Sequence, residues 1–337
     1  MTSHKELSMS RAEIHLFKQE EIDPQQWDAF IAASPQGSLY ATHGYLRTLR
    51  PDWQAYIIEE KGEWGLVMPF VVNRKWRYRF LPQLPLTQFG GPVYRDLSTI
   101  AERQRISFLD RWLELLLQAW DAYDLIILNT SPEASYLLPF HWYGFELRKR
   151  YTFWWDIRPD EQTLFNGLSR TLKRKVRKAD EAHFTMQFED KPDILFTLLK
   201  KNQVAGHDLL AGNGLAWDRI QALALHLYKT GQGDIVTVKE GETVLSAALF
   251  GKYKGQLLYL LGTYDPEYAK SGAMPWLIWQ YVCRMRQKGF QTMDFEGSMI
   301  KGIAQFFRDF GVYPVAYTQL YRNHLPAVVS WIRELRT

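Results

Sequence analysis

The sequence predicts an α/β (α+β) protein made of two tandem copies of one unit, each a mixed, twisted sheet flanked by helices. At 337 residues the chain exceeds the usual size of one hydrophobic core, so two domains are expected. Residues 234–263 form three strand-like runs separated by Glu240-Gly241 and Lys254-Gly255. One order of signals also occurs twice: a helix, a strand, a turn that ends in Ser, a second helix, and an aromatic-Gly-apolar triplet. In both copies the Gly follows the Ser by thirteen residues, Ser131 to Gly144 in the first and Ser298 to Gly311 in the second.

The first half has clear helix and hairpin signals. Pro24 suits the first turn of a helix, and Lys61-Gly62-Glu63 suits the turn of a hairpin. The expected elements are a strand at 12–17, helices at 24–35 and 42–51, strands at 54–59, 64–72 and 74–80, a helix at 100–120, a strand at 124–128 and a short helix before Gly144.

Residues 74–80 alternate between basic and aromatic side chains. Their alternation places Lys75, Arg77 and Arg79 on one strand face and Trp76, Tyr78 and Phe80 on the other. The pattern favours a strand with one face in the core and one in water, and the alternative is a surface for single-stranded nucleic acid. The next loop, 81–92, holds three prolines and ends near Gln88-Phe89-Gly90-Gly91, so it suits a substrate rim or a simple connector.

The second half opens on a helix with a basic stripe. An apolar stripe from Leu164 to Ala179 is expected to pack this helix against the core. The helix also carries six basic residues, with no acidic residue among them: Arg170, Lys173, Arg174, Lys175, Arg177 and Lys178. These six charges exceed the net charge of +4, so the basicity is a local patch. A local patch suits one phosphate-bearing group, while the alternative is a solvated helix face.

The last part of the chain is expected to contain helices ending near 206 and 231, then the three strands and a helix at 274–287. Ser271-Gly272-Ala273 lies in a small-residue loop at the start of that helix, where free N–H groups can bind an anion. The strand 290–295 leads into Asp294-Phe295-Glu296-Gly297-Ser298. A strand would place Asp294 and Glu296 on the same face. The pair would then form either a two-carboxylate site or a row of acids on the surface. Ser298 is expected to cap the next helix.

Composition excludes several classes of protein. Cys283 is the single cysteine, and no Cys/His cluster has zinc-ligand spacing, so we expect no disulfide framework and no metal site. The N-terminal residues 1–11 lack the apolar region of a secretory signal, and no run approaches the ~18 apolar residues of a membrane span. A cytoplasmic protein without a transmembrane segment is therefore expected.

These features resemble a known family. The element order of 244–321, the basic helix and the Asp-Phe-Glu-Gly-Ser turn followed by Phe306–Gly311 resemble the Fem-type branch of the GNAT acyltransferase superfamily, which includes peptidoglycan bridge aminoacyltransferases. The resemblance implies GNAT-like domains at 1–155 and 156–337, with the last ~15 residues packing back on the first. It places the acceptor between the domains.

The resemblance also implies roles for residues. The phosphate of the acceptor would be bound by Arg170, Lys173, Arg174 and Arg177. The rim of the substrate site would be formed by Gln88, Phe89, Gly90 and Gly91. The donor would be bound by the central strands and by Ser271, Gly272 and Ala273. Glu296 would be the base, with Asp294 as its orienter or alternate.

The implied co-substrate is acyl-CoA or aminoacyl-tRNA, with no tightly bound cofactor. The loop at 270–275 lacks the Gln/Arg-x-x-Gly-x-Gly/Ala spacing of acetyl-CoA-dependent enzymes, so the donor stays open. The acceptor would be a small molecule or a cell-envelope precursor, and DNA is not expected as a partner. The alternatives are a non-catalytic RNA- or nucleotide-ligand-binding protein that uses residues 74–79 and 170–178, and an envelope protein that has lost the transferase chemistry.

Overall fold

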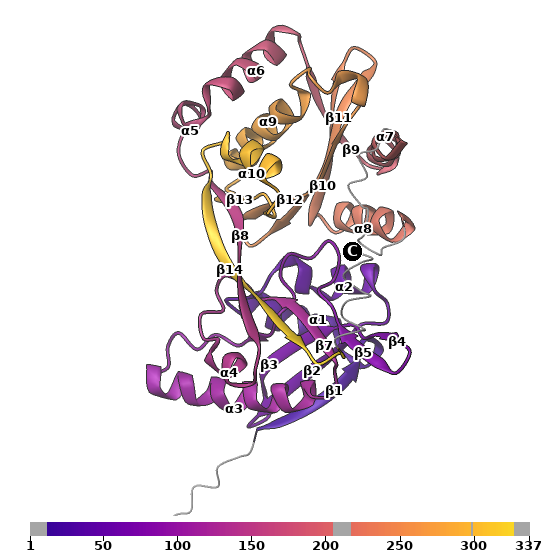
Figure 1. The fold of residues 1–337 in the computed structure, drawn as a ribbon. Coiled ribbons are helices and arrows are strands. Elements are labelled where there is room, and N and C mark those ends of the chain that lie inside the picture. The colour runs from indigo at the N-terminus through magenta and orange to yellow at the C-terminus, as the bar shows by residue number, and fades with distance from the viewer. Residues whose placement is uncertain (1–11, 205–216, 298, 327–337) are drawn as a thin grey trace, which may run out of the picture. The chain divides into compact units, whose positions relative to one another are not determined.

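The protein is described by a computed structural model that covers residues 12–204, 217–297 and 299–326 (Figure 1). The chain divides into two compact units. Unit 1 comprises the chain up to Arg148 and the chain from Thr318 on, and unit 2 comprises Lys149–Tyr317. The units divide between Arg148 and Lys149, inside strand β8 (Glu146–Asp156), whereas the predicted boundary lies between 155 and 156 near the end of that strand.

Unit 1 contains two groups of strands. The first group has the order β1-β2-β3-β6 and the second has the order β4-β5-β7-β14. The bounds are β1 (Glu13–Lys18), β2 (Gln54–Glu60), β3 (Glu63–Phe70), β4 (Asn73–Lys75), β5 (Tyr78–Leu81), β6 (Val93–Tyr94), β7 (Leu125–Asn129) and β14 (Tyr313–Asn323). Of β14, residues Gln319–Asn323 pair with β7, so the chain returns to unit 1, and residues beyond Pro326 lie outside the described part.

The helices of unit 1 follow the predicted signals. They are α1 (Pro24–Ala33), α2 (His43–Leu49), α3 (Glu102–Trp120) and α4 (Leu138–Trp142). Asp23 caps α1 by accepting a hydrogen bond from the Gln26 N–H, directly before Pro24. Helix α3 buries one apolar stripe, including Trp112 and Trp120, against the core that it shares with β2, β3 and β7.

Unit 2 has one sheet with helices on both faces. Its strand order is β8-β13-β12-β11-β10-β9, with β9 (Thr185–Glu189), β10 (Gly233–Glu240), β11 (Thr243–Tyr253), β12 (Gln256–Tyr264) and β13 (Thr292–Asp294). Its helices are α5 (Glu161–Gly167), α6 (Arg170–Glu181), α7 (Asp193–Val204), α8 (Trp217–Lys229), α9 (Ala273–Gln287) and α10 (Lys301–Arg308). Helices α7 and α8 cover one face, and α9 covers the other (Figure 1). Helix α9 is buried on nearly all sides, as expected of a helix between a sheet and α6.

The two units repeat one order of elements, which confirms the predicted fold class. Each has a strand, two helices, a run of strands, a long helix, a short strand and a short helix that ends at a left-handed glycine before a long strand. These glycines are Gly144, with φ +79°, and Gly311, with φ +78°, the pair that the thirteen-residue spacing identified. In both units the short strand after the long helix pairs in parallel with an earlier strand, β7 with β5 and β13 with β12.

Two predicted elements differ from the structure. The helix expected to run from Leu164 to Ala179 is divided into α5 and α6, because Leu168 is extended and the Ser169 hydroxyl caps a new helix by accepting from the Leu172 N–H. The apolar stripe is nevertheless buried throughout. The strand expected at 74–80 is a hairpin, since β4 ends at Lys75 and β5 begins at Tyr78.

Candidate functional site

The central strands of unit 2 diverge beside the two predicted carboxylates. Strands β12 and β13 pair in parallel over only three positions, the last of which joins Leu258 and Asp294. Strand β13 ends there, whereas β12 continues to Tyr264. The pairing of β11 with β12 shifts register between Leu249 and Phe250, so Leu260 is the extra residue of a bulge. Within the described residues no strand pairs with this edge of β12 beyond Leu258, which leaves peptide groups there for a ligand.

Asp294 is fully buried at the point of divergence. Its Oδ1 atom accepts a hydrogen bond from the Thr152 hydroxyl and one from the Glu296 N–H, the latter at 2.8 Å. Burial raises the pKa of Asp294 to about 6, although these two hydrogen bonds favour the charged form. Trp154 is paired with Asp294 across β8 and β13, and it also lowers the pKa of Asp294. Neither the Trp154 indole N–H nor the Asp294 Oδ2 atom has a hydrogen-bond partner among the described residues.

Glu296 does not lie on a strand, which corrects the prediction that both carboxylates share one strand face. Glu296 has a φ of +57°, and Gly297 follows with a φ of +61°, so the chain turns directly after Phe295. The half-buried Glu296 is held in this uncommon conformation by the bond from its N–H to Asp294. Helix α10 begins only at Lys301, with Ile300 as its N-cap, and Ser298 lies outside the described residues.

The predicted donor loop lies at the start of α9. Gly272 is the N-cap of this helix with a φ of +84°, and the Ala273 N–H donates to the Ser271 hydroxyl at 3.2 Å. A Cβ on Gly272 would lie 3.4 Å from Lys175 Cβ, so α6 covers this turn. Because Ser271 occupies one N–H of the first turn and Pro275 has none, the turn offers fewer donors than an open helix N-terminus.

The basic stripe lies on α6, with Val176 and the other apolar residues facing the core of unit 2. Lys173 Nζ donates to the Asn166 carbonyl at 2.8 Å, and the Arg177 guanidinium lies 5.4 Å from the Phe165 ring centre. Arg170 and Arg174 are exposed. Across the described ranges none of the six cations on this helix forms an ion pair, so their charge is available to an anionic ligand.

The rim predicted at Gln88-Phe89-Gly90-Gly91 belongs to unit 1, where the parallel pairing of β5 with β7 ends. The Gly90 and Gly91 N–H groups both donate to the Asn129 carbonyl, at 2.9 and 3.0 Å, and the Asn129 side chain donates to the Gln88 carbonyl at 3.0 Å. The loop therefore closes the end of its own strand pair. A cavity of about 20 Å³ beside Phe89, Gly90 and Gly91 has room for about one water. The Gln88 side chain is buried, and both polar atoms of its amide lack a partner among the described residues.

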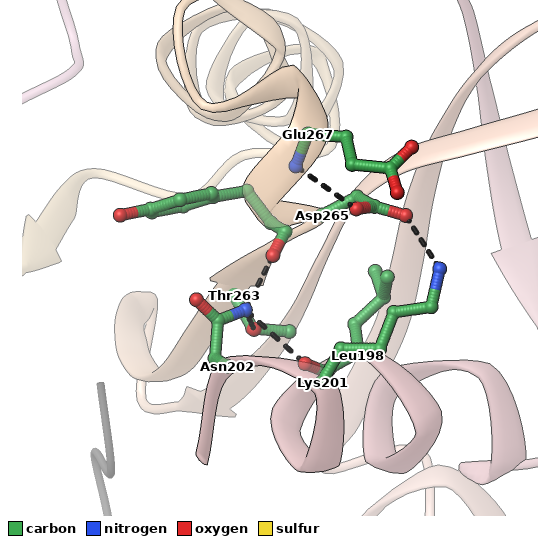
Figure 2. A network of polar contacts seen from close by, with 7 residues as sticks. Leu198, Lys201, Asn202, Thr263, Asp265 and Glu267 are labelled. Atoms are coloured by element: carbon green, nitrogen blue, oxygen red, sulfur yellow. Dashed lines mark hydrogen bonds and ion pairs between the residues drawn. The ribbon is translucent and has the colours of Figure 1, made fainter. Parts of the chain in front are cut away.

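A polar network that the sequence did not reveal fixes the end of β12 (Figure 2). Asn202 of α7 is buried, and its amide donates to the Leu198 carbonyl, the Thr263 hydroxyl at 2.9 Å and the Tyr264 carbonyl. Lys201 Nζ forms an ion pair with Asp265 at 2.8 Å. The contacts of Asn202 and Lys201 with residues 263–265 join positions more than 60 residues apart, so only the fold identifies them. They hold the strand that carries the free edge.

Replacing Asn202 with alanine should destabilise the protein by about 2 kcal/mol, because buried oxygen acceptors of β12 would lose their donor. Urea unfolding measures this change. The matched control is Lys200→Ala, an exposed neighbour on the same helix, which should leave the unfolding midpoint unchanged. Equal midpoints for the Asn202 and Lys200 variants would contradict a structural role for the network.

The described residues contain no metal-binding cluster and no helix that is both long and apolar enough to cross a bilayer. The geometry instead agrees with the family comparison. Residues 167–308 match the family model described as an acetyltransferase (GNAT) domain. The match to this part of the chain agrees with the predicted GNAT superfamily and with the predicted enzyme class of N-acyltransferase.

Solved structures resemble the chain over most of its length. FemX superposes with a TM-score of 0.66 at 16% identity, covering 91% of this chain and 96% of FemX. L-PGS from Bacillus licheniformis has a TM-score of 0.57 at 15% identity, over 93% and 96%. A tandem GNAT protein from the clavulanic acid biosynthesis pathway has a TM-score of 0.57 at 10% identity, over 94% and 100%. At these identities the likeness establishes a shared tandem GNAT fold. No curated protein sequence matches the chain.

Proposed function

We propose that this GNAT-type protein transfers an acyl or aminoacyl group from a carrier-linked donor to an amine of a phosphate-bearing or envelope-related acceptor. The observation that carries the proposal is the divergence of β12 and β13 beside Asp294 and Glu296, because it combines free peptide groups with a carboxylate. The fold shared with FemX agrees with the resemblance to the Fem-type branch, and that resemblance is the reason for proposing an aminoacyl group and an envelope acceptor.

The reaction is assigned to unit 2 because, of the two parallel strand pairs in the described residues, that of unit 2 opens toward a ligand. In unit 1 the chain leaves β5 at Pro82, which cannot donate a backbone hydrogen bond, and returns to donate from Gly90 and Gly91 to β7. The equivalent space in unit 1 is thus filled by its own loop. Unit 2 has no such loop among its described residues, since β12 continues as a strand.

The donor is acyl-CoA or aminoacyl-tRNA. GNAT domains use acyl-CoA, and the free edge of β12 suits the extended, amide-bearing arm of such a carrier. The first turn of α9 is a poor phosphate cradle, however, because Ser271 and Pro275 reduce its free N–H groups and α6 covers Gly272. This favours a donor whose phosphates are bound elsewhere.

The chemistry is an acyl transfer to nitrogen. The acceptor amine attacks the donor carbonyl, a C–N bond forms, and the bond from the carbonyl carbon to the carrier oxygen or sulfur breaks. Glu296 accepts the proton that the amine loses, and the carrier leaves as its alcohol or thiol after taking up a proton. Peptide N–H groups of β12 stabilise the developing oxyanion. Asp294 acts as a positioning residue through its bond to the Glu296 N–H.

The function is tested by incubating the purified protein with labelled acetyl-CoA or with tRNA charged with labelled amino acids, together with a cell extract as the source of acceptor. A covalently labelled product that is absent with Glu296→Gln supports the proposal. Binding without any product would instead assign the chain to the non-catalytic alternative.

The Arg174→Ala, Arg177→Ala double variant should bind inorganic pyrophosphate about 10-fold more weakly for each guanidinium that contacts a phosphate. Both side chains lie on the exposed stripe of α6 without an ion-pair partner in the part of the chain that the structure describes. Titration calorimetry at low and high salt gives the affinities. The matched control is Arg219→Ala, Lys288→Ala, which removes the same charge from other exposed sites of unit 2. If both double variants weakened pyrophosphate binding equally, the effect would come from the net charge of the protein and not from a site on α6.

A further inference from the structure

The hairpin of β4 and β5 presents an exposed tryptophan at its tip. The two-residue turn consists of Trp76 and Arg77, between the paired residues Lys75 and Tyr78. The prediction that Trp76 faces the core is wrong, because 75% of this residue is exposed. Trp76 also has a φ of +56°, a conformation that bulky residues rarely adopt. An exposed tryptophan in such a conformation is not explained by packing.

Three cations surround this tip. Arg74, Lys75 and Arg77 are all exposed, and among the described residues none of them forms an ion pair. The Lys75 ammonium lies 5.8 Å from the Trp76 ring centre, and Arg77 donates to the Tyr78 hydroxyl at 3.2 Å. The hairpin therefore combines a tryptophan with a positive charge that no carboxylate neutralises.

A groove with apolar side chains in its lining lies next to the hairpin. On β7, Ile126 and Leu128 pack into the core of unit 1, so Leu125 and Ile127 face the other way. The groove has a volume of about 520 Å³, and its lining includes Val72, Phe80, Leu125 and Ile127, together with Arg74 and Lys75. These apolar side chains are buried or half-buried, whereas Arg74, Lys75 and the neighbouring Asn73 are exposed.

We propose that the hairpin and the groove form a docking site for the anionic lipids of a membrane surface. Trp76 would lie at the level of the headgroups, which is where tryptophan rings concentrate at membrane interfaces. Arg74, Lys75 and Arg77 would contact lipid phosphates, and the groove would accept part of one acyl chain. This inference does not depend on the proposed transfer reaction, because it involves other residues and a different unit.

The groove favours lipid over single-stranded RNA. RNA binding uses successive aromatic platforms along a basic track, since each base stacks on its own ring. At this hairpin Trp76 is the exposed large ring, whereas Phe80 is half-buried in the groove lining, which also includes Leu125 and Ile127. An aliphatic lining stacks no base, but it matches a hydrocarbon chain.

The test is co-flotation of the full-length protein with vesicles of phosphatidylcholine alone or of phosphatidylcholine with an equal amount of phosphatidylglycerol. The wild type should bind only the second type, and added salt should weaken the binding. Arg74→Ala, Lys75→Ala should lower the partition coefficient about 30-fold, because each basic residue near the surface contributes about fivefold. Trp76→Asn, which tolerates the left-handed turn, should lower it severalfold without a change in charge.

The controls separate this site from general effects. Trp142→Ser removes another exposed tryptophan of unit 1, and Arg103→Ala, Lys288→Ala removes two exposed charges elsewhere; both should bind like the wild type. Failure of the wild type to bind anionic vesicles, or equal losses in the controls and the hairpin variants, would overturn the proposal. Binding of single-stranded poly(U) that requires Trp76, without vesicle binding, would also overturn it and assign the hairpin to RNA.

Discussion

Replacing Glu296 with glutamine should lower turnover about 100- to 10,000-fold, the usual contribution of a general base. The substitution keeps the length of the side chain and its hydrogen-bonding capacity, but glutamine cannot accept the proton that the acceptor amine loses. It also keeps the backbone bond from residue 296 to Asp294, so the left-handed turn should persist. The measurement is steady-state turnover with the donor identified by the labelling experiment.

The kinetic pattern distinguishes a base from a structural residue. Loss of a base should lower kcat and leave KM nearly unchanged, whereas distortion of the turn should raise KM and lower the unfolding midpoint. Glu240→Gln is the matched control, because Glu240 is an exposed carboxylate at the end of β10 in the same unit. Wild-type turnover in Glu296→Gln would dismiss the role of Glu296, while leaving the fold and the acyltransferase class intact.

The repeated architecture could be predicted because its signals are local. A short helix that ends at a left-handed glycine before a strand is encoded within a few residues, so Gly144 and Gly311 marked equivalent places in the two units. The apolar stripe of α5 and α6 was equally readable. Its break at Leu168 was missed because Ser169 is compatible both with a helix interior and with an N-cap, and only the packing decides.

The hairpin at Trp76 could not be predicted from its residues. Two-residue hairpin turns usually contain Asn-Gly or Asp-Gly, which tolerate positive φ, whereas this turn contains Trp76 and Arg77. Without a turn signal, the alternation of basic and aromatic residues is indistinguishable from that of a single strand. The sequence did identify the residues as unusual, and the structure changes their interpretation from a core face to an exposed tip.

The carboxylate turn was only partly predictable. Proximity in the chain guarantees that Asp294 and Glu296 are near each other, but the end of β13 depends on Thr152, which is 142 residues away in the sequence. Its hydroxyl holds the Asp294 side chain inward, where the same carboxylate accepts the Glu296 N–H. The two acids therefore have different environments, Asp294 fully buried and Glu296 half-buried in the turn, which no strand periodicity can indicate.

The buried position of Asp294 gives the stability of the protein a defined dependence on pH. In the folded protein the pKa of Asp294 is raised from 3.8 to about 6 by burial. The folded state therefore binds this proton more tightly than the unfolded chain does between these two pH values. The stabilisation by the protonated form is complete below pH 3.8 and is lost as pH rises through about 6. A shift of about two pH units corresponds to about 3 kcal/mol.

Asp294→Asn should remove this dependence, because asparagine does not ionise and its carbonyl can still accept from Thr152 and the Glu296 N–H. The free energy of unfolding of the variant relative to wild type should thus rise by about 3 kcal/mol between pH 4 and pH 7. Comparing the two proteins at each pH cancels every other titrating group, and urea unfolding at four or five pH values is sufficient. A constant difference over this range would mean that Asp294 ionises normally in the fold. That result would contradict the burial of the Asp294 carboxylate, but it would not contradict the bond from the Glu296 N–H that holds the turn.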